Sequence, residues 1–218
     1  MDQIIKYQLE KGNKPRPQEK LSYTPMRIRE PQGVLSYPGR VIATDDRLYI
    51  ADSGHNRILV LSSRGDVLHQ FGSEAAGLID GNGTGAAFNN PQGMALVDGF
   101  LYVADEGNHA IRRIQTRTGD VDTIAGTGKI GKSVPGLNDT PLSVAMNSPC
   151  DVVFKGGNLY IAMSGLHQIW RLSLVTNKLE IFSGSGREGL LDGPATTAAF
   201  SQPSGMTLLL NRLYTVDA

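Results

Sequence analysis

The sequence has very little cysteine: Cys150 is the only one among 218 residues. A lone cysteine forms no disulfide within the chain, and no Cys-x-x-Cys pair or Cys/His spacing typical of a zinc site is present. We therefore expect no metal ion and no cofactor. The composition favours a reducing compartment, so we expect a cytoplasmic protein, although a disulfide-free protein of an organelle lumen or the cell exterior would also fit.

Long apolar segments and aromatic side chains are scarce as well. No run approaches the roughly 18 apolar residues that suggest a membrane-spanning helix, so no membrane association is expected. The N-terminal stretch MDQIIKYQLEKG lacks the apolar core of a secretion signal. Aromatic residues make up 6% of the chain, whereas there are 26 glycines. Such a composition suits short strands joined by tight turns better than long helices.

An excess of charge of either sign is also missing, since 21 basic residues balance 21 acidic ones. The basic residues are enriched in residues 1–30, which leaves residues 31–218 with three more acidic than basic side chains. A broad phosphate-binding surface is therefore disfavoured there, and we expect no nucleic-acid partner. The glycine clusters also lack the spacing of a phosphate-binding loop, which makes them connecting loops rather than nucleotide sites.

What the sequence does contain is an internal repeat of four copies. Each copy places a tyrosine eleven residues after a proline, as in Pro38 and Tyr49, Pro91 and Tyr102, Pro149 and Tyr160, and Pro203 and Tyr214. The copies begin 53, 58 and 54 residues apart, somewhat more than the ~40–50 residues of a four-stranded propeller blade. Longer connections between blades would account for the difference, and these also repeat: the pair Asp-Gly precedes Ala-Ala-Phe and a proline at equal offsets in two of them.

Within the first copy, four strands are expected, at residues 41–43, 48–51, 57–61 and 67–71, with turns at DSGHN (52–56) and SSRGD (62–66). Four strands joined by three turns make one blade of a propeller. The sequence therefore predicts an all-β array with blades at about 36–76, 88–130, 146–188 and 200–218, the last one truncated. Residues 1–35 are expected to be a linker, in which residues 2–10 could form a short helix.

The second and third copies resemble a known repeat. The segment YVADEGNHAI (102–111) is similar to the NHL repeat, with Asn108-His109-Ala110 in place of Asn-His-Leu. SPCDVVF (148–154) and LYIAMSGLHQIW (159–170) resemble a blade of NHL proteins that carry a thioredoxin-like domain and a linker ahead of the propeller, including Met163 where Asp is usual. The resemblance covers about residues 36–218. It implies a six-bladed parent propeller, of which this chain holds three blades and the start of a fourth.

This chain differs from those proteins in ways that limit what the resemblance implies. It contains no thioredoxin-like domain or redox cysteine motif, so no redox activity is carried over to it. Cys150 also stands where the family has an aromatic residue.

Asp52, Asp105 and Asp217 follow the second strand of their copies, where each begins a turn. We expect them to be structural, with Asp52 and Asp105 accepting hydrogen bonds from amides one to four residues later. His109 and His167 share one register at the start of the third strand. We expect both histidines to pack in the turn rather than bind metal, because equivalent positions in neighbouring blades lie far apart.

The residues just after each repeat proline begin the innermost strands, which meet at one mouth of a propeller channel. We therefore expect Arg40, Gln92, Cys150 and Ser204 to line a binding site there. Beside them, Gly39, Gly93, Asp151 and Gly205 are expected to share one slot, in which Asp151 is the exception. This carboxylate could bind a cation or an amine, or it could cap the start of the strand.

The sequence thus favours a non-catalytic propeller that acts as a rigid scaffold for a protein or peptide partner. Apolar blade faces left without a neighbouring blade could also make the chain associate. Two alternatives remain open. One is a metal-dependent lyase or hydrolase with a site in the channel, for which only Asp151 is a suitable ligand. The other is an RNA-binding NHL propeller, against which the slight acidity of residues 31–218 argues.

Overall fold

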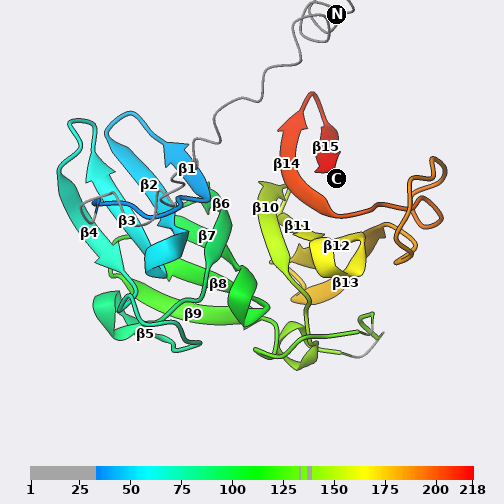
Figure 1. The fold of residues 1–218 in the computed structure, drawn as a ribbon, viewed down its shortest axis with the longest axis horizontal. Coiled ribbons are helices and arrows are strands. Elements are labelled where there is room, and N and C mark those ends of the chain that lie inside the picture. Colours follow the sequence, from blue (N-terminus) through cyan, green and yellow to red (C-terminus); the bar gives the residue numbers. More distant parts are fainter. Residues whose placement is uncertain (1–32, 133, 137–138) are drawn as a thin grey trace, which may run out of the picture. The chain divides into compact units, whose positions relative to one another are not determined.

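The computed structural model describes residues 33–132, 134–136 and 139–218, and residues 34–218 form one compact unit (Figure 1). The regular structure of this unit consists of antiparallel strands and short 3-10 helices, which confirms the all-β class. The helix expected within residues 2–10, like most of the predicted linker, falls outside the described residues. Among those described, no helix is long and apolar enough to cross a bilayer.

The strands form successive sheets that follow the repeat. The first sheet has four strands in sequence order, namely β1 (Arg40–Ala43), β2 (Arg47–Asp52), β3 (Arg57–Ser62) and β4 (Val67–Phe71). The third sheet has the same order, with β10 (Pro149–Lys155), β11 (Asn158–Met163), β12 (Gln168–Ser173) and β13 (Lys178–Ser183). The fourth contains the hairpin of β14 (Pro203–Leu209) and β15 (Arg212–Asp217).

The second sheet differs from the expected four strands. It contains β6 (Pro91–Val97), β7 (Phe100–Asp105), β8 (Ala110–Gln115) and β9 (Asp120–Ala125), and a fifth strand, β5 (Gly81–Asn82). β5 comes from the preceding connection and pairs with β9 at the outer edge. The glycine cluster at 81–85, expected to be a plain connector, therefore supplies a strand and the 3-10 helix η3 (Gly83–Gly85).

The tyrosines of the repeat occupy equivalent places on the second strand of each sheet. Tyr49, Tyr102, Tyr160 and Tyr214 pair with Ile42, Ala95, Val153 and Thr207, which lie four residues after the repeat proline in every copy. Tyr49, Tyr102 and Tyr160 pack in the cluster shared with the next sheet, whereas the residues beside Tyr102 and Tyr160 pack in the cluster shared with the previous one, as the two-residue period of a strand requires.

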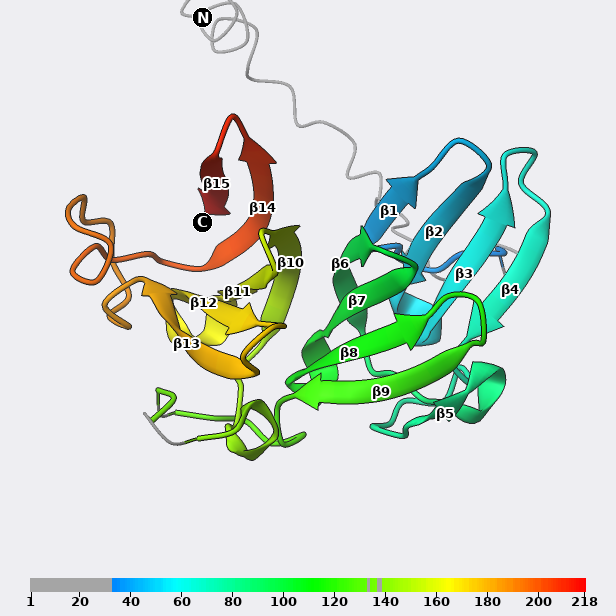
Figure 2. The same ribbon diagram turned by 180° about the vertical axis from the view of Figure 1, so that it is seen from behind.

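The core lies between consecutive sheets, which pack face to face. One cluster of buried side chains joins the first two sheets, another joins the second and third, and a third joins the third and fourth. The innermost strands contact in series, β1 with β6, β6 with β10 and β10 with β14 (Figures 1 and 2). Hydrophobic burial between consecutive sheets is the main stabilising term in such an array.

The connections between sheets repeat in their hydrogen bonding. After β4, the amides of Ser73 and Gly77 donate to the carbonyl oxygens of Ala86 and Phe88. After β13, the amides of Ser185 and Gly189 donate to the matching carbonyl oxygens of Ala198 and Phe200. The repeated sequence of the connections thus gives a repeated structure, in which each connection folds back beneath the sheet that follows.

The aspartates after the second strand accept hydrogen bonds from different partners than we expected. Oδ1 of Asp52 accepts from the amide of Ser36, and Oδ1 of Asp105 accepts from the amide of Asn89, at 2.6 and 2.8 Å. Both amides lie sixteen residues before the carboxylate, and no side-chain cap bonds the following 3-10 turn. The prediction of bonds within the turn was therefore wrong. The carboxylate instead fastens the segment that leads into the first strand.

His109 and His167 lie in the left-handed conformation at the end of their 3-10 turns, as does Asn56 in the first repeat. Their side chains reach into the next repeat rather than only packing in the turn. Oδ1 of Asn56 accepts from the amide of Asn90 at 2.9 Å, and Nδ1 of His109 accepts from the amide of Ser148 at 3.1 Å. Nδ1 of His167 bonds the carbonyl oxygen of Ser201. These side chains, which we call the inter-repeat straps, tie each sheet to the next.

Candidate functional site

One end of the innermost strands carries the polar residues of the candidate site. In each sheet the first strand begins opposite the end of the second, as the pairs Pro91–Asp105, Pro149–Met163 and Pro203–Asp217 show. The residues after the proline and the residue after the second strand therefore lie at the same end. Because the innermost strands are side by side, these positions from successive sheets come together.

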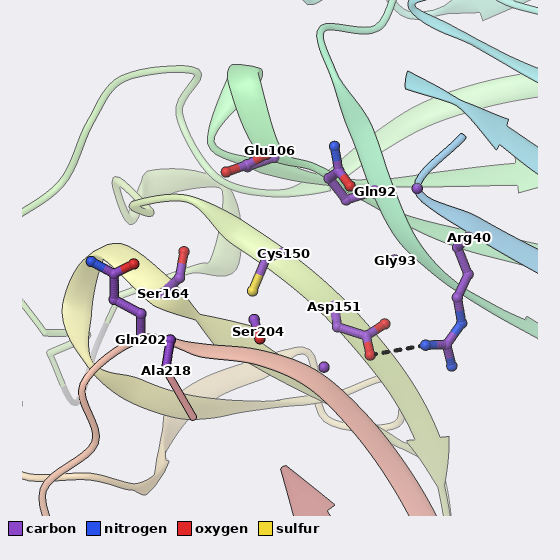
Figure 3. Close-up of a pocket in the computed structure, with 12 residues that line it drawn as sticks. Arg40, Gln92, Gly93, Glu106, Cys150, Asp151, Ser164, Gln202, Ser204 and Ala218 are labelled. Carbon is purple, nitrogen blue, oxygen red and sulfur yellow. Dashed lines mark hydrogen bonds and ion pairs between the residues drawn. The ribbon is translucent and has the colours of Figure 1, made fainter. Parts of the chain in front are cut away.

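They line a pocket of about 420 Å³ (Figure 3). All five residues predicted to form the binding site lie on its wall, namely Arg40, Gln92, Cys150, Asp151 and Ser204. The remaining lining residues are Gly39, Gly93, Glu106, Ser164, Gln202, Gly205 and Ala218.

The strand register corrects the predicted equivalence of these residues. Arg40 pairs with Ala51 just as Asp151 pairs with Ala162, so Arg40, and not Gly39, shares a slot with Asp151. Gly93 and Gly205 occupy the same slot in the second and fourth repeats. This position of the repeat is therefore occupied by one basic residue, one acidic residue and two glycines. Counting from the repeat proline gives the same slot, because all four residues follow their proline by two positions, whereas Gly39 follows Pro38 by one.

Arg40 and Asp151 form an ion pair across Gly93. Nη1 of Arg40 lies 3.2 Å from Oδ2 of Asp151, although 111 residues separate them and they belong to the first and third repeats. A Cβ atom at Gly93 would lie 2.2 Å from Oδ1 of Asp151, far inside van der Waals contact. The glycine of the second repeat thus permits the close approach of the third repeat.

The carboxylate of Asp151 is buried, and both of its oxygens are hydrogen-bonded within the protein. Its side chain is 3% exposed, Oδ1 accepts from the amide of Val152, and Oδ2 accepts from the amide of Met206 in β14 at 2.7 Å. Burial raises the pKa of Asp151, while these amides and Arg40 act in the opposite direction. This carboxylate was expected either to bind a cation or an amine or to cap the start of the strand. Its hydrogen bonds correspond to capping, because it accepts from strand amides, one of them in the next sheet.

Cys150 is a protonated thiol in this pocket. Its Sγ lies 3.0 Å from the carbonyl oxygen of Pro203 and 3.4 Å from that of Ala162. Burial raises the pKa of the thiol to about 11, and the negative charges of Asp151 and Glu106 act in the same direction. Since the thiolate is the nucleophilic form, the pocket holds Cys150 in its unreactive state.

Glu106, Ser164 and Gln202 are pocket residues that the sequence analysis missed. Glu106 and Ser164 are the first residues of the 3-10 helices η4 (Glu106–Asn108) and η6 (Ser164–Leu166). Both directly follow the second strand, and Ala218 follows β15 in the same way. The position after the Tyr-x-Ala-Asp stretch was thus a usable signal, because it lies opposite the start of the first strand.

In the described ranges, no group of three or more His, Cys, Asp or Glu side chains is arranged to hold a metal ion. His109 and His167 do not line the pocket. Nδ1 of each histidine is engaged with the next repeat, as described above.

Antiparallel sheets that repeat along the chain, pack face to face and bring their innermost strands together define a β-propeller architecture. Residues 88–114 match the family model of the NHL repeat. The chain is 40% identical over 205 residues to NHL repeat-containing protein 2 of Gallus gallus, a match covering 82% of this chain and 27% of that protein. It is also 40% identical over 209 residues to Protein SUPPRESSOR OF QUENCHING 1, chloroplastic, of Arabidopsis thaliana, covering 92% and 18%.

The chain belongs to the NHL-repeat family. It spans about a quarter, or less, of the length of the curated relatives it matches.

Solved structures agree on the fold. Virginiamycin B lyase from Staphylococcus aureus matches with a TM-score of 0.51 at 17% identity, covering 84% of this chain and 49% of that chain. A protein of unknown function from Bacteroides thetaiotaomicron matches with a TM-score of 0.52 at 25% identity, covering 61% and 34%. Likeness at this level concerns the architecture alone.

Proposed function

We propose that this chain is a non-catalytic propeller scaffold that binds a segment of a protein or peptide partner in the pocket at the ends of β6, β10 and β14. The observation that carries the proposal is a polar pocket whose strongest potential catalytic groups are already engaged. Both carboxylate oxygens of Asp151 accept hydrogen bonds from backbone amides, and the pKa of Cys150, about 11, keeps its thiol protonated. Catalysis by either of these two groups would need it as a free base or nucleophile.

The remaining lining suits recognition of a polar segment. Gln92, Gln202 and Ser204 supply amide and hydroxyl groups that can both donate and accept hydrogen bonds. They stand on innermost strands, or just before one, which the packing of neighbouring sheets holds rigid. A site built on rigid elements loses less conformational entropy on binding than a site built on loops. A cytoplasmic location is part of the same proposal and is supported by the single, protonated cysteine.

The test is a selection of binders from a random dodecapeptide library on the purified chain. The variant Ser204→Arg places a long charged side chain at the pocket, whereas Ser63→Arg makes the same change in the exposed turn after β3. We expect selected peptides to bind the original chain and Ser63→Arg alike, and to bind Ser204→Arg at least about tenfold more weakly, a loss of about 1.4 kcal/mol. Peptides that bind Ser204→Arg undiminished, or no selected peptide at all, would contradict the proposal.

A further inference from the structure

Glu106 is the one charged side chain of the pocket lining that no charge of opposite sign balances within the described part of the chain. The lining contains three charged side chains, of which Arg40 and Asp151 pair with each other. Glu106 takes part in no ion pair there, and its Oε2 accepts a single hydrogen bond, from Nδ2 of Asn90 at 2.6 Å. With the Arg40 and Asp151 charges cancelling, the side chains of the pocket have the net charge of Glu106.

The carboxylate of Glu106 is also partly removed from water. Burial raises its pKa, so the ionised form is less stable here than in solvent. Its charge contributes to the raised pKa of Cys150, which places it within electrostatic reach of the middle of the pocket. In Figure 3 the side chain of Glu106 lies apart from the Arg40–Asp151 pair. A cation brought into the pocket would therefore meet Glu106 without first having to break that pair.

Asn90 holds Glu106 in place and orients its neighbour. Nδ2 of Asn90 donates to Glu106, while Oδ1 of Asn90 accepts from Nε2 of Gln92 at 2.8 Å. Asn90 is itself held in place, because its backbone amide donates a hydrogen bond to Oδ1 of Asn56, the inter-repeat strap of the first repeat. The side-chain carbonyl of Gln92 instead lies against Gly39, where an added Cβ would be 2.5 Å from its Oε1. A carboxylate held in this way, with lone pairs still available, is suited to a charged donor with several N–H groups.

We propose that the pocket accepts a basic side chain, a lysine or arginine of the bound segment, with Glu106 as its counter-ion. This proposal rests on the proposed function, and it names the chemistry of the partner. A bound ammonium or guanidinium would neutralise the one unbalanced charge of the pocket, and partial exclusion of water would strengthen the attraction. A metal ion fits less well, because a single available carboxylate does not supply the several ligands that such an ion requires.

The experiment repeats the dodecapeptide selection in parallel on the original chain, on Glu106→Gln and on Glu188→Gln. Glu188 is an exposed glutamate of the connection after β13, outside the pocket, so its variant removes the same charge elsewhere. We expect pocket-dependent peptides from the original chain and from Glu188→Gln to be enriched in Lys or Arg at one position. Glu106→Gln should lose that enrichment, and it should bind the selected peptides about tenfold more weakly.

A second measurement needs no change to the protein. Acetylation of the enriched lysine of a selected peptide removes its charge, and affinity for the original chain should then fall about tenfold. If pocket-dependent peptides show no basic preference, or if both Glu106→Gln and acetylation leave affinity unchanged, this inference is wrong while the scaffold proposal stands. If no peptide depends on the pocket, both proposals fail.

Discussion

A glycine at position 93 lets the third repeat approach the second closely, so the most specific prediction at the residue scale concerns this position. Gly93→Ala should destabilise the chain by about 1–3 kcal/mol, because the added methyl group would overlap the carboxylate of Asp151. Gly205→Ala is a matched control, since Gly205 occupies the same slot in the fourth repeat and nothing lies within 4 Å of an added Cβ. Urea unfolding of both variants measures the difference. Equal losses would disprove the role given to Gly93.

The thiol of Cys150 should react slowly with iodoacetamide. With its pKa at about 11, the thiolate fraction near pH 7.5 is far below that of a free cysteine, and we expect alkylation roughly a hundredfold slower than in the unfolded chain. The rate should keep rising with pH past 9, where a free cysteine levels off. Mass spectrometry of quenched samples gives both rates. A rate equal to that of the unfolded chain would show that the pocket does not protect the thiol.

The second and third repeats fill the same two buried positions with different pairs of residues. In the second, Asp105 and the fully buried Arg112 form an ion pair at 2.9 Å. The matching positions of the third repeat hold Met163 and Trp170, both buried, with Trp170 donating to Oε1 of Gln168. The unusual methionine therefore leaves no arginine unpaired, because the arginine is replaced as well.

Arg112→Met should destabilise the chain by about 3–5 kcal/mol near pH 7.5, since it leaves Asp105 buried without its cation. The neighbouring change Arg113→Met breaks an exposed pair and should cost about 1 kcal/mol or less. Burial raises the pKa of Asp105 to about 6 even with Arg112 present, so the ionised carboxylate is disfavoured in the folded chain.

Folding stability associated with Asp105 accordingly falls as pH rises from about 4 to about 6, since the unfolded carboxyl ionises at the lower pKa. Without Arg112 the folded pKa is higher still, and the fall extends to higher pH. The cost of Arg112→Met should therefore be smaller at pH 5 than at pH 7.5, as urea unfolding at the two pH values would show. A cost that grows on acidification would contradict this account of the pair.

At the scale of elements, the inter-repeat straps should accept either asparagine or histidine. His109→Asn should preserve stability within about 0.5 kcal/mol, because Asn56 fills the same role in the first repeat and asparagine tolerates the left-handed conformation. His109→Ala loses both the acceptor and that tolerance, and should cost about 1–3 kcal/mol. Denaturant unfolding distinguishes the two variants. If asparagine and alanine were equally destabilising, the hydrogen bond to Ser148 would not be the stabilising feature.

The strands and their register could be predicted from the sequence because they depend on local patterns. The eleven-residue step from proline to tyrosine fixes how far the first strand lies from the second, and the tyrosines fall in equivalent places. The pocket residues could be predicted for a related reason. Once a propeller is assumed, the residues that begin the innermost strands must meet at one end.

The remaining features depend on contacts that no local pattern encodes. The amides that bond Asp52 and Asp105 lie sixteen residues earlier, in the segment before the first strand. The expectation that amides of the following turn would bond these carboxylates was therefore wrong. The slot of Arg40 is an exception, because Arg40 follows Pro38 by two residues as Asp151 follows Pro149, so the repeat itself gives the correct equivalence. Glu106 was overlooked because the end of a second strand reaches the pocket only through pairing with the first.

At the scale of the whole chain, the fourth sheet leaves apolar surface exposed. Tyr49 and Tyr102 are 5% and 7% exposed because a following sheet covers them, whereas Tyr214 is 47% and Val216 65% exposed. β15 is paired on one side only within the described sheets. An uncovered apolar face beside an unpaired strand edge favours association between molecules.

We therefore expect the isolated 218-residue chain to associate as its concentration rises, with sedimentation coefficients that increase accordingly. The double variant Tyr214→Lys with Val216→Lys should reduce this association, because it places charges on the exposed face. A monodisperse monomer that unfolds cooperatively would show that the open array is stable without further strands.

The central claim, that the pocket at the ends of the innermost strands is a binding site, is tested most directly by photo-crosslinking. A photoreactive phenylalanine derivative is placed at position 204, on the pocket wall, or at position 63, in the exposed turn after β3. Each protein is then irradiated with a library-selected peptide that binds the unmodified chain. The account predicts crosslinks from position 204, reduced by excess unlabelled peptide, and none above background from position 63. Equal crosslinking from both positions, or crosslinking from position 63 alone, would contradict it.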